Sequence, residues 1–79
     1  MKYAYLLESE AYPDHFYTGI TDDLRDRLAR HNRGLVTHTA KFRPSRSKTY
    51  VGFTDEQKAF AFERYLMTAS GRAFAKKRL

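Results

Sequence analysis

Residues 2–20, KYAYLLESEAYPDHFYTGI, form the most informative segment of the chain for predicting its fold. Its two ends, Lys2–Leu7 and His15–Ile20, are rich in aromatic and aliphatic residues, which favour β-strands. Between them, residues 11–14 (AYPD) carry the proline and aspartate that are typical of a turn. The stretch therefore predicts a β-hairpin at the start of the chain.

A helix is predicted directly after the hairpin, over residues 22–33. Leu24 and Leu28 share one face of it, and Gly34 follows as a left-handed stop. The cap and the first-turn acids are Thr21, Asp22 and Asp23. Residues 35–46 (LVTHTAKFRPSR) show no sustained period, so we predict a basic loop there.

The second half of the chain predicts one strand and two helices. Residues 47–53 (SKTYVGF) have strand composition, and Thr54–Gln57 match the S/T-x-x-Q capping box at the start of an apolar helix. Ser70 and Gly71 are expected to end that helix, and residues 72–78 then predict a short basic one. The order β, β, α, β, α, α predicts an α+β fold, with a small three-stranded antiparallel β-sheet flanked by helices.

Length and composition limit the class of protein. The 79 residues suffice for one core, so we predict a single domain over residues 1–79. No apolar run approaches the roughly 18 residues of a membrane span, and the acids near the N-terminus do not fit a secretory signal. We therefore expect a cytoplasmic protein with no membrane association. The absence of cysteine excludes disulfides, thiolate metal sites and cysteine nucleophiles.

The charge is unevenly distributed along the chain, whose formal net charge is +6. Residues 1–24 have one lysine against five acids, whereas residues 25–48 have eight lysines and arginines against one acid. Residues 49–79 add a further net +3. A basic band of this size attracts phosphate polyanions. A solvated basic face that only aids solubility is the alternative.

Arg27 and His31 project from the same stripe of the first predicted helix, at spacing i, i+4. Arg27 lies at the boundary of the buried stripe, where it could clamp a phosphate or form a surface ion pair with Asp23. On spacing alone, His31 is a solvated last-turn histidine that is favourable at a helix C-terminus.

Glu63 places a carboxylate on or beside the apolar stripe of the second long helix, between Ala59 and Leu66. An unpaired carboxylate there is costly, so Glu63 must find an arginine, a tyrosine hydroxyl or a metal ion. Pairing with a neighbour such as Arg27 and binding a metal are both open at this stage.

Tyr5 and Tyr17 fall near the middle of the two hairpin strands. Tyrosines in a small sheet commonly serve packing. The functional alternative is a pair of phenols that point into one cleft. A cationic neighbour would then lower the pKa of one phenol and allow it to act as a general base.

In combination, these residues resemble the GIY-YIG nuclease superfamily. The matching segments are Tyr3-Ala4-Tyr5-Leu6, Tyr17-Thr18-Gly19, Arg27, His31-Asn32 and Glu63 within AFERYL. The chain looks most like small stand-alone bacterial members and is similar to the N-terminal catalytic domain of the excinuclease C subunit. Tyr3 stands where the first motif has glycine, Thr18 replaces an aliphatic residue, and no asparagine follows Glu63 as it does in larger members.

The resemblance implies a metal-dependent endonuclease that hydrolyses phosphodiester bonds of nucleic acid, with DNA as the expected substrate and RNA as the alternative, in DNA repair or processing. It assigns catalytic roles to Tyr5, Tyr17, Arg27 and His31, with Gly19 as the motif glycine. Tyr17 would take the proton of the attacking water, directly or with His31, and Tyr5 would orient that water or assist Tyr17. Arg27 would neutralise charge on the non-bridging oxygens. Glu63 would hold one divalent cation, Mg²⁺ or Mn²⁺.

Nucleic-acid contacts are expected from the basic loop and from the end of the helix before it. The residues are Arg30, His38, Lys41, Arg43 and Arg46. An ordinary exposed loop is the alternative. We expect specificity to come from this loop or from a protein partner. Two other functions remain open: a nucleic-acid-binding module with this fold but no useful turnover, and a small interaction domain for an acidic protein.

Overall fold

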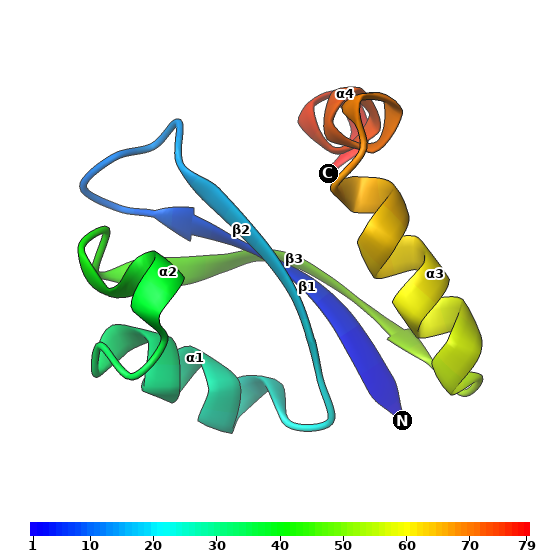
Figure 1. Cartoon of the computed structure of the whole chain (residues 1–79), viewed down its shortest axis with the longest axis horizontal. Helices are drawn as coiled ribbons and strands as arrows, with labels where there is room; N and C mark the ends of the chain where they lie inside the picture. The colour runs from blue at the N-terminus through cyan, green and yellow to red at the C-terminus, as the bar shows by residue number, and fades with distance from the viewer.

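The computed structural model describes all residues, 1–79, and Figure 1 shows its arrangement. The elements are β1 (Lys2–Ser9), β2 (Phe16–Thr21), α1 (Leu24–Asn32), α2 (Thr37–Ala40), β3 (Ser45–Phe53), α3 (Glu56–Leu66) and α4 (Ala69–Arg78). The three strands form one antiparallel sheet in the order β2-β1-β3. Helices α1 and α2 lie to one side of the sheet and α3 and α4 to the other (Figure 1). The predicted α+β fold is confirmed.

Strand β1 is the centre of the molecule because it pairs with both other strands. Its residues Ala4, Tyr5, Leu6 and Leu7 are consecutive and all buried. Side chains alternate across a strand, so Tyr5 points toward α1 while Leu6 packs with Leu66 of α3 and Ala75 of α4. An unbroken apolar run is what a strand covered on both faces requires.

Two predicted helix boundaries need correction. Asp55, not Thr54, caps α3, since its carboxylate accepts hydrogen bonds from the backbone N–H groups of Gln57 and Lys58. Gly71 lies inside α4 rather than ending α3, as does its neighbour Ser70. The prediction was wrong because Gly71 packs so closely against the Tyr65 carbonyl that any Cβ would collide with it. The glycine thus serves the α3–α4 junction, not a helix end.

The predicted basic loop also differs from the structure. Residues 37–40 form the short helix α2, and β3 begins at Ser45, two residues earlier than predicted. Gly34 has a φ of +78°, which confirms the left-handed stop after α1. The amide of Asn32 bonds both to the carbonyl and to the N–H of Ser45, and so joins the end of α1 to the start of β3.

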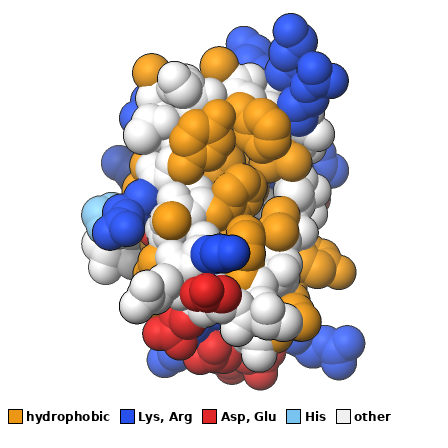
Figure 2. Space-filling model, turned by 90° about the vertical axis from the view of Figure 1, so that its right-hand side faces the viewer, with side chains coloured by type: hydrophobic (Ala, Val, Ile, Leu, Met, Phe, Trp, Pro, Cys, Tyr) orange, Lys and Arg blue, Asp and Glu red, His pale blue; other side chains and the backbone are white.

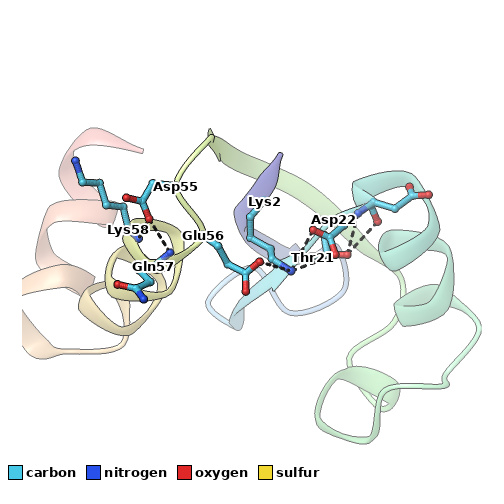
Figure 3. Close-up of polar contacts among 8 residues, drawn as sticks. Lys2, Thr21, Asp22, Asp55, Glu56, Gln57 and Lys58 are labelled. Carbon is cyan, nitrogen blue, oxygen red and sulfur yellow. Dashed lines mark hydrogen bonds and ion pairs between the residues drawn. The ribbon is translucent and has the colours of Figure 1, made fainter.

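Lys2 connects the two helical sides of the molecule. Its Nζ lies 3.1 Å from Asp22, in the turn before α1, and 3.8 Å from Glu56, in the first turn of α3 (Figure 3). The lysine therefore joins the starts of the two helices that carry Arg27 and Glu63. No helix reaches the length and apolarity that crossing a membrane requires.

Candidate active site

His31 is the most deeply buried large side chain, with no exposed surface. Its Nε2 lies 3.1 Å from the hydroxyl of Tyr5 on β1, and its Nδ1 lies 2.7 Å from Oγ1 of Thr39 on α2. Both ring nitrogens are therefore used. The expectation of a solvated last-turn histidine was wrong, because α1 lies against the sheet at this position and α2 closes over it.

Thr39 links α2 to this pair. Its Oγ1 lies 2.7 Å from Nδ1 of His31 and 3.4 Å from the carbonyl oxygen of Val36. A neutral imidazole has one donor and one acceptor nitrogen, so His31 is hydrogen-bonded on both sides in either tautomer. From the sequence, Thr39 is predicted to lie in the exposed basic loop of residues 35–46. Only the structure shows that it is buried and contacts His31.

Burial shifts the ionisation of both partners in this pair. Desolvation, reinforced by the positive charge of Arg27, lowers the pKa of His31 to about 4. Desolvation also raises the pKa of Tyr5 to about 12, although Arg27 acts in the opposite direction. Both groups are therefore neutral at pH 7. For Tyr5, the cation does not lower the phenol pKa as anticipated, because burial outweighs it.

The lowered pKa of His31 predicts acid sensitivity. As pH falls below about 6.5, the unfolded chain protonates this histidine while the folded chain does not. The stability that neutral His31 contributes is therefore lost as pH falls from about 6.5 toward 4, by roughly 2 kcal/mol between about pH 7 and 5. Urea unfolding at these pH values measures the loss. A His31→Gln variant should lose much less over that range, whereas a His38→Gln variant should behave like the wild type. Equal pH dependence of all three proteins would contradict the burial of His31.

Gly19 on β2 makes room for the Tyr5 ring. The two residues are paired across the strands, and a Cβ on Gly19 would overlap the hydroxyl end of Tyr5. The phenol thus passes directly over the glycine on its way to His31. This contact explains sterically why the Tyr17-Thr18-Gly19 segment has a glycine at position 19.

We predict that Gly19→Ala destabilises the protein by about 1–3 kcal/mol, as expected for overpacking in a core. Tyr5 cannot move aside without breaking its hydrogen bond to His31. A smaller loss is expected for Gly52→Ala, where a Cβ would meet the exposed Met1 side chain at 2.6 Å and the half-buried Tyr3 ring at 3.0 Å, because Met1 can rotate away and no hydrogen bond fixes the Tyr3 hydroxyl. Chemical denaturation should therefore separate the two alanine variants. Equal stabilities would show that the Tyr5 ring does not depend on the glycine.

Tyr17 is the more accessible of the two phenols and is half-buried. Its ring centroid lies 4.9 Å from that of His31 and 6.4 Å from that of Tyr5. Tyr17 also lines a small cavity of about 60 Å³, together with Thr39 and His38. The two phenols therefore meet around the imidazole, and only Tyr17 has a substantial surface toward solvent.

Arg27 is half-buried and makes no salt bridge. The alternative of an ion pair with Asp23 is not realised, because the Asp23 carboxylate caps α1 by accepting the N–H of Asp26. Arg27 lines a cavity of about 380 Å³ between α1 and the sheet, together with Tyr5. Its guanidinium is therefore unneutralised and close to the buried pair.

Glu63 is half-buried on α3 and forms neither a hydrogen bond nor an ion pair. The alternative of pairing with Arg27 is thus not realised. The carboxylate is nevertheless near enough to Tyr5 to raise the pKa of that phenol. Glu63 and Arg27 therefore act electrostatically on the same hydroxyl, from different helices.

The Glu63 carboxylate could bind a divalent cation that keeps most of its water ligands. No group of three or more histidine and acidic side chains comes together in the structure, so a cage made of protein ligands alone is absent. Mg²⁺ is commonly held by one or two carboxylates, with retained waters and substrate phosphate completing the coordination. Glu63, half-buried and without a protein partner, matches that donor set.

The five residues expected to contact nucleic acid differ in whether their side chains already interact with other groups of the protein. Arg30 and His38 are exposed. Lys41 lies over the Phe42 ring, and Arg43 donates to the carbonyl of Ala40. Arg46 is bonded through two nitrogens to Glu8, at 2.7 and 3.1 Å. That pairing neutralises Arg46 locally, so its charge is the least available of the five.

Comparison with known proteins adds one match. The family model described as the GIY-YIG catalytic domain matches residues 1–78. No curated protein and no solved structure matches the chain significantly. The family consists of nucleases. Since the match spans almost every residue and the structure brings the matching tyrosines, arginine and histidine together, the chain belongs to the GIY-YIG family.

Proposed function

We propose that this protein is a metal-dependent endonuclease that hydrolyses phosphodiester bonds of DNA, and that residues 1–79 act as one catalytic domain. The observation that carries the proposal is that Arg27 and Glu63 both lack a protein partner and both act electrostatically on the hydroxyl of Tyr5, which is hydrogen-bonded to His31. Arg27 comes from α1 and Glu63 from α3, on the other side of the sheet (Figure 1). Two opposite charges without protein partners are available to bind a phosphate group and a cation.

The accessible phenol is our candidate for the general base. In the proposed reaction, Tyr17 acts as its phenolate: it takes a proton from water as the water oxygen attacks phosphorus, the bond to the 3′ oxygen breaks, and the departing oxygen takes a proton from solvent. Tyr5 is held neutral by burial, so we propose that it orients the water rather than deprotonating it. His31 acts through Tyr5 and Tyr17, both of which pack against its ring.

Charge stabilisation is divided between α1 and α3. Arg27 would bind the non-bridging oxygens of the phosphate, on which negative charge develops. Glu63 would hold the single divalent cation, Mg²⁺ or Mn²⁺, which when bound neutralises the departing oxygen.

The substrate and the setting follow from the charge. The net +7 segment of residues 25–48 supports a polyanionic substrate, and we propose DNA rather than RNA. Arg30, His38, Lys41 and Arg43 are our candidates for backbone contacts, with Arg46 contributing once it leaves Glu8. We further propose a role in DNA repair or processing in the cytoplasm, with a protein partner adding specificity.

A cleavage assay tests the proposal. Purified protein is incubated with plasmid and with single-stranded DNA in Mg²⁺, in Mn²⁺ and in a chelator. We expect cleavage with either metal, none with chelator, and none by a protein that carries both Arg27→Ala and Glu63→Ala. Cleavage by the double variant at the wild-type rate would refute the proposed site. Salt-sensitive binding without any cleavage would instead support a binding module that retains the nuclease fold.

A further inference from the structure

Four aromatic side chains gather at the end of the sheet where β1 leads into β2 and β3 begins. They form a surface that we call the aromatic platform: Tyr12, His15, Phe16 and Phe42. The His15 and Phe42 rings are stacked, 4.1 Å apart at 20°, and Tyr12 meets both edge-on. Tyr12 and Phe16 are each 52% exposed. Large aromatic faces are therefore held open to solvent.

Hydrogen bonds hold together the two chain segments that carry the platform. Ser9, which is buried, donates its hydroxyl to the Phe42 carbonyl at 2.6 Å and accepts the N–H of Tyr12 at 3.0 Å. The N–H of Glu10 bonds to the carbonyl of Pro44, at 2.9 Å. These bonds join the β1–β2 turn to the segment before β3. The aromatic faces are thus arranged before any ligand binds, which lowers the entropy cost of binding.

Cations flank the platform and are free to meet a ligand. Lys41 Nζ lies 5.4 Å from the Phe42 ring centroid, and Lys48 Nζ lies 5.8 Å from that of Phe16. Neither lysine forms an ion pair. Aromatic faces interleaved with free positive charges are the features that bind the bases and phosphates of a strand.

Another exposed apolar surface of the molecule lacks this combination. Figure 2 shows the face formed by α3 and α4, where hydrophobic side chains also gather. Phe60, Tyr65 and Phe74 are partly exposed there. The lysine above Phe60 is Lys2, which two carboxylates already neutralise. The α3–α4 face therefore serves as an internal comparison for the platform.

The platform borders the candidate catalytic phenol. Phe16, His15 and Phe42 line the same small cavity as Tyr17. A strand whose phosphate reaches Tyr17 would carry its neighbouring bases over these rings.

We propose that the aromatic platform binds the bases of an unpaired nucleic-acid strand next to the bond that is cut, an inference that rests on the proposed nuclease function. In a duplex, each base face is covered by its neighbours, so an exposed ring can stack only on an unstacked base. Tyr12 and Phe16 supply the stacking faces. Lys41 and Lys48 contact the flanking phosphates.

The chain contains no tryptophan, which permits a direct test. A Phe16→Trp variant carries a single tryptophan on the platform, and a Phe74→Trp variant carries one on α4. Both are titrated with oligothymidylate in chelator, so that no cleavage occurs. We expect strong quenching of the fluorescence at position 16 and little at position 74, because indole that stacks on a base is quenched. Equal quenching at both positions, or none at position 16, would overturn the inference.

Affinity measurements complete the test. Phe16→Ala combined with Tyr12→Ala should weaken binding of a single strand by at least about 30-fold at constant salt, since losing each base stack costs at least about fivefold in affinity. Binding of a blunt duplex of the same sequence should change less than about twofold, and Phe74→Ala should change neither. Lys48→Ala should instead reduce the salt dependence of binding.

The outcomes separate this inference from the proposed function. Binding and metal-dependent cleavage that survive the double alanine variant unchanged would refute the platform and leave the nuclease intact. Equal losses for single strand and duplex would refute the preference for unpaired bases. If the wild-type protein binds no nucleic acid at low salt, then both proposals fail. Binding of an acidic peptide to the platform, in place of oligonucleotide, would assign the surface to a protein partner.

Discussion

Replacing Glu63 by glutamine is expected to lower kcat/KM for DNA cleavage by about 100- to 1,000-fold while the protein stays folded. Glutamine has nearly the same shape, but it lacks the negative charge that would hold a divalent cation. Loss of metal-assisted stabilisation costs several kcal/mol in the transition state, and each 1.4 kcal/mol is about tenfold in rate. Since Glu63 forms no hydrogen bond or ion pair and glutamine fills the same space, the cost should fall mainly on activity.

Steady-state cleavage at several Mn²⁺ concentrations measures this effect. The required metal concentration should rise along with the fall in rate. The matched control is Glu56→Gln on the same helix, whose carboxylate is exposed and makes only the 3.8 Å contact with Lys2. That variant should retain activity within about twofold, because an exposed ion pair contributes little. Full activity of Glu63→Gln with unchanged metal dependence would remove Glu63 from the metal site.

Replacing Arg27 by alanine is expected to lower kcat by about 100- to 1,000-fold, the usual cost of losing one group that stabilises transition-state charge. The guanidinium has no acidic partner in the protein, so its removal breaks no salt bridge. The same change should raise the pKa of His31, because the positive charge of Arg27 contributes to lowering it. Activity and the histidine titration thus give independent measures of where Arg27 lies.

Single-turnover cleavage and NMR titration of the His31 ring provide the two measurements. Arg33→Ala is the control, since Arg33 is exposed and contributes only its backbone to the end of α1. It should change neither the chemical step nor the His31 pKa. An Arg27→Lys variant should recover part of the rate, because a lysine keeps the charge but not the paired donors. If Arg27→Ala cleaves at the wild-type rate, the guanidinium does not contact the reacting phosphate.

The elements of the fold were largely predictable, because hairpins and helices are encoded by residues close together in the chain. The aromatic content of residues 2–20 predicted the hairpin, and Gly34 marked the end of α1. The errors occurred where a distant contact overrides local preference. Gly71 looked like a helix breaker, yet it lies within α4 because Tyr65 packs against it.

For the candidate site too, some features were predictable from the sequence and others were not. The resemblance named Tyr5, Tyr17, Arg27, His31 and Glu63 from their order and spacing. It could not reveal that His31 is buried and neutral, or that Thr39 completes its hydrogen bonds. It also left open whether Arg27 and Glu63 were already paired. Ionisation and pairing depend on all charges and apolar groups within several ångströms, whatever their position in the chain.

The basic charge, the succession of strands and helices, and the tyrosines, arginine, histidine and glutamate of the candidate site can all be identified from the amino-acid sequence. Their burial, ionisation and hydrogen bonding depend on tertiary packing. Tyr5 and His31 are 26 residues apart, and the hydrogen bond between them exists only because α1 packs on the sheet above Gly19. That packing removes water from both groups and sets their pKa values. It also leaves Tyr17, Arg27 and Glu63 partly exposed to solvent.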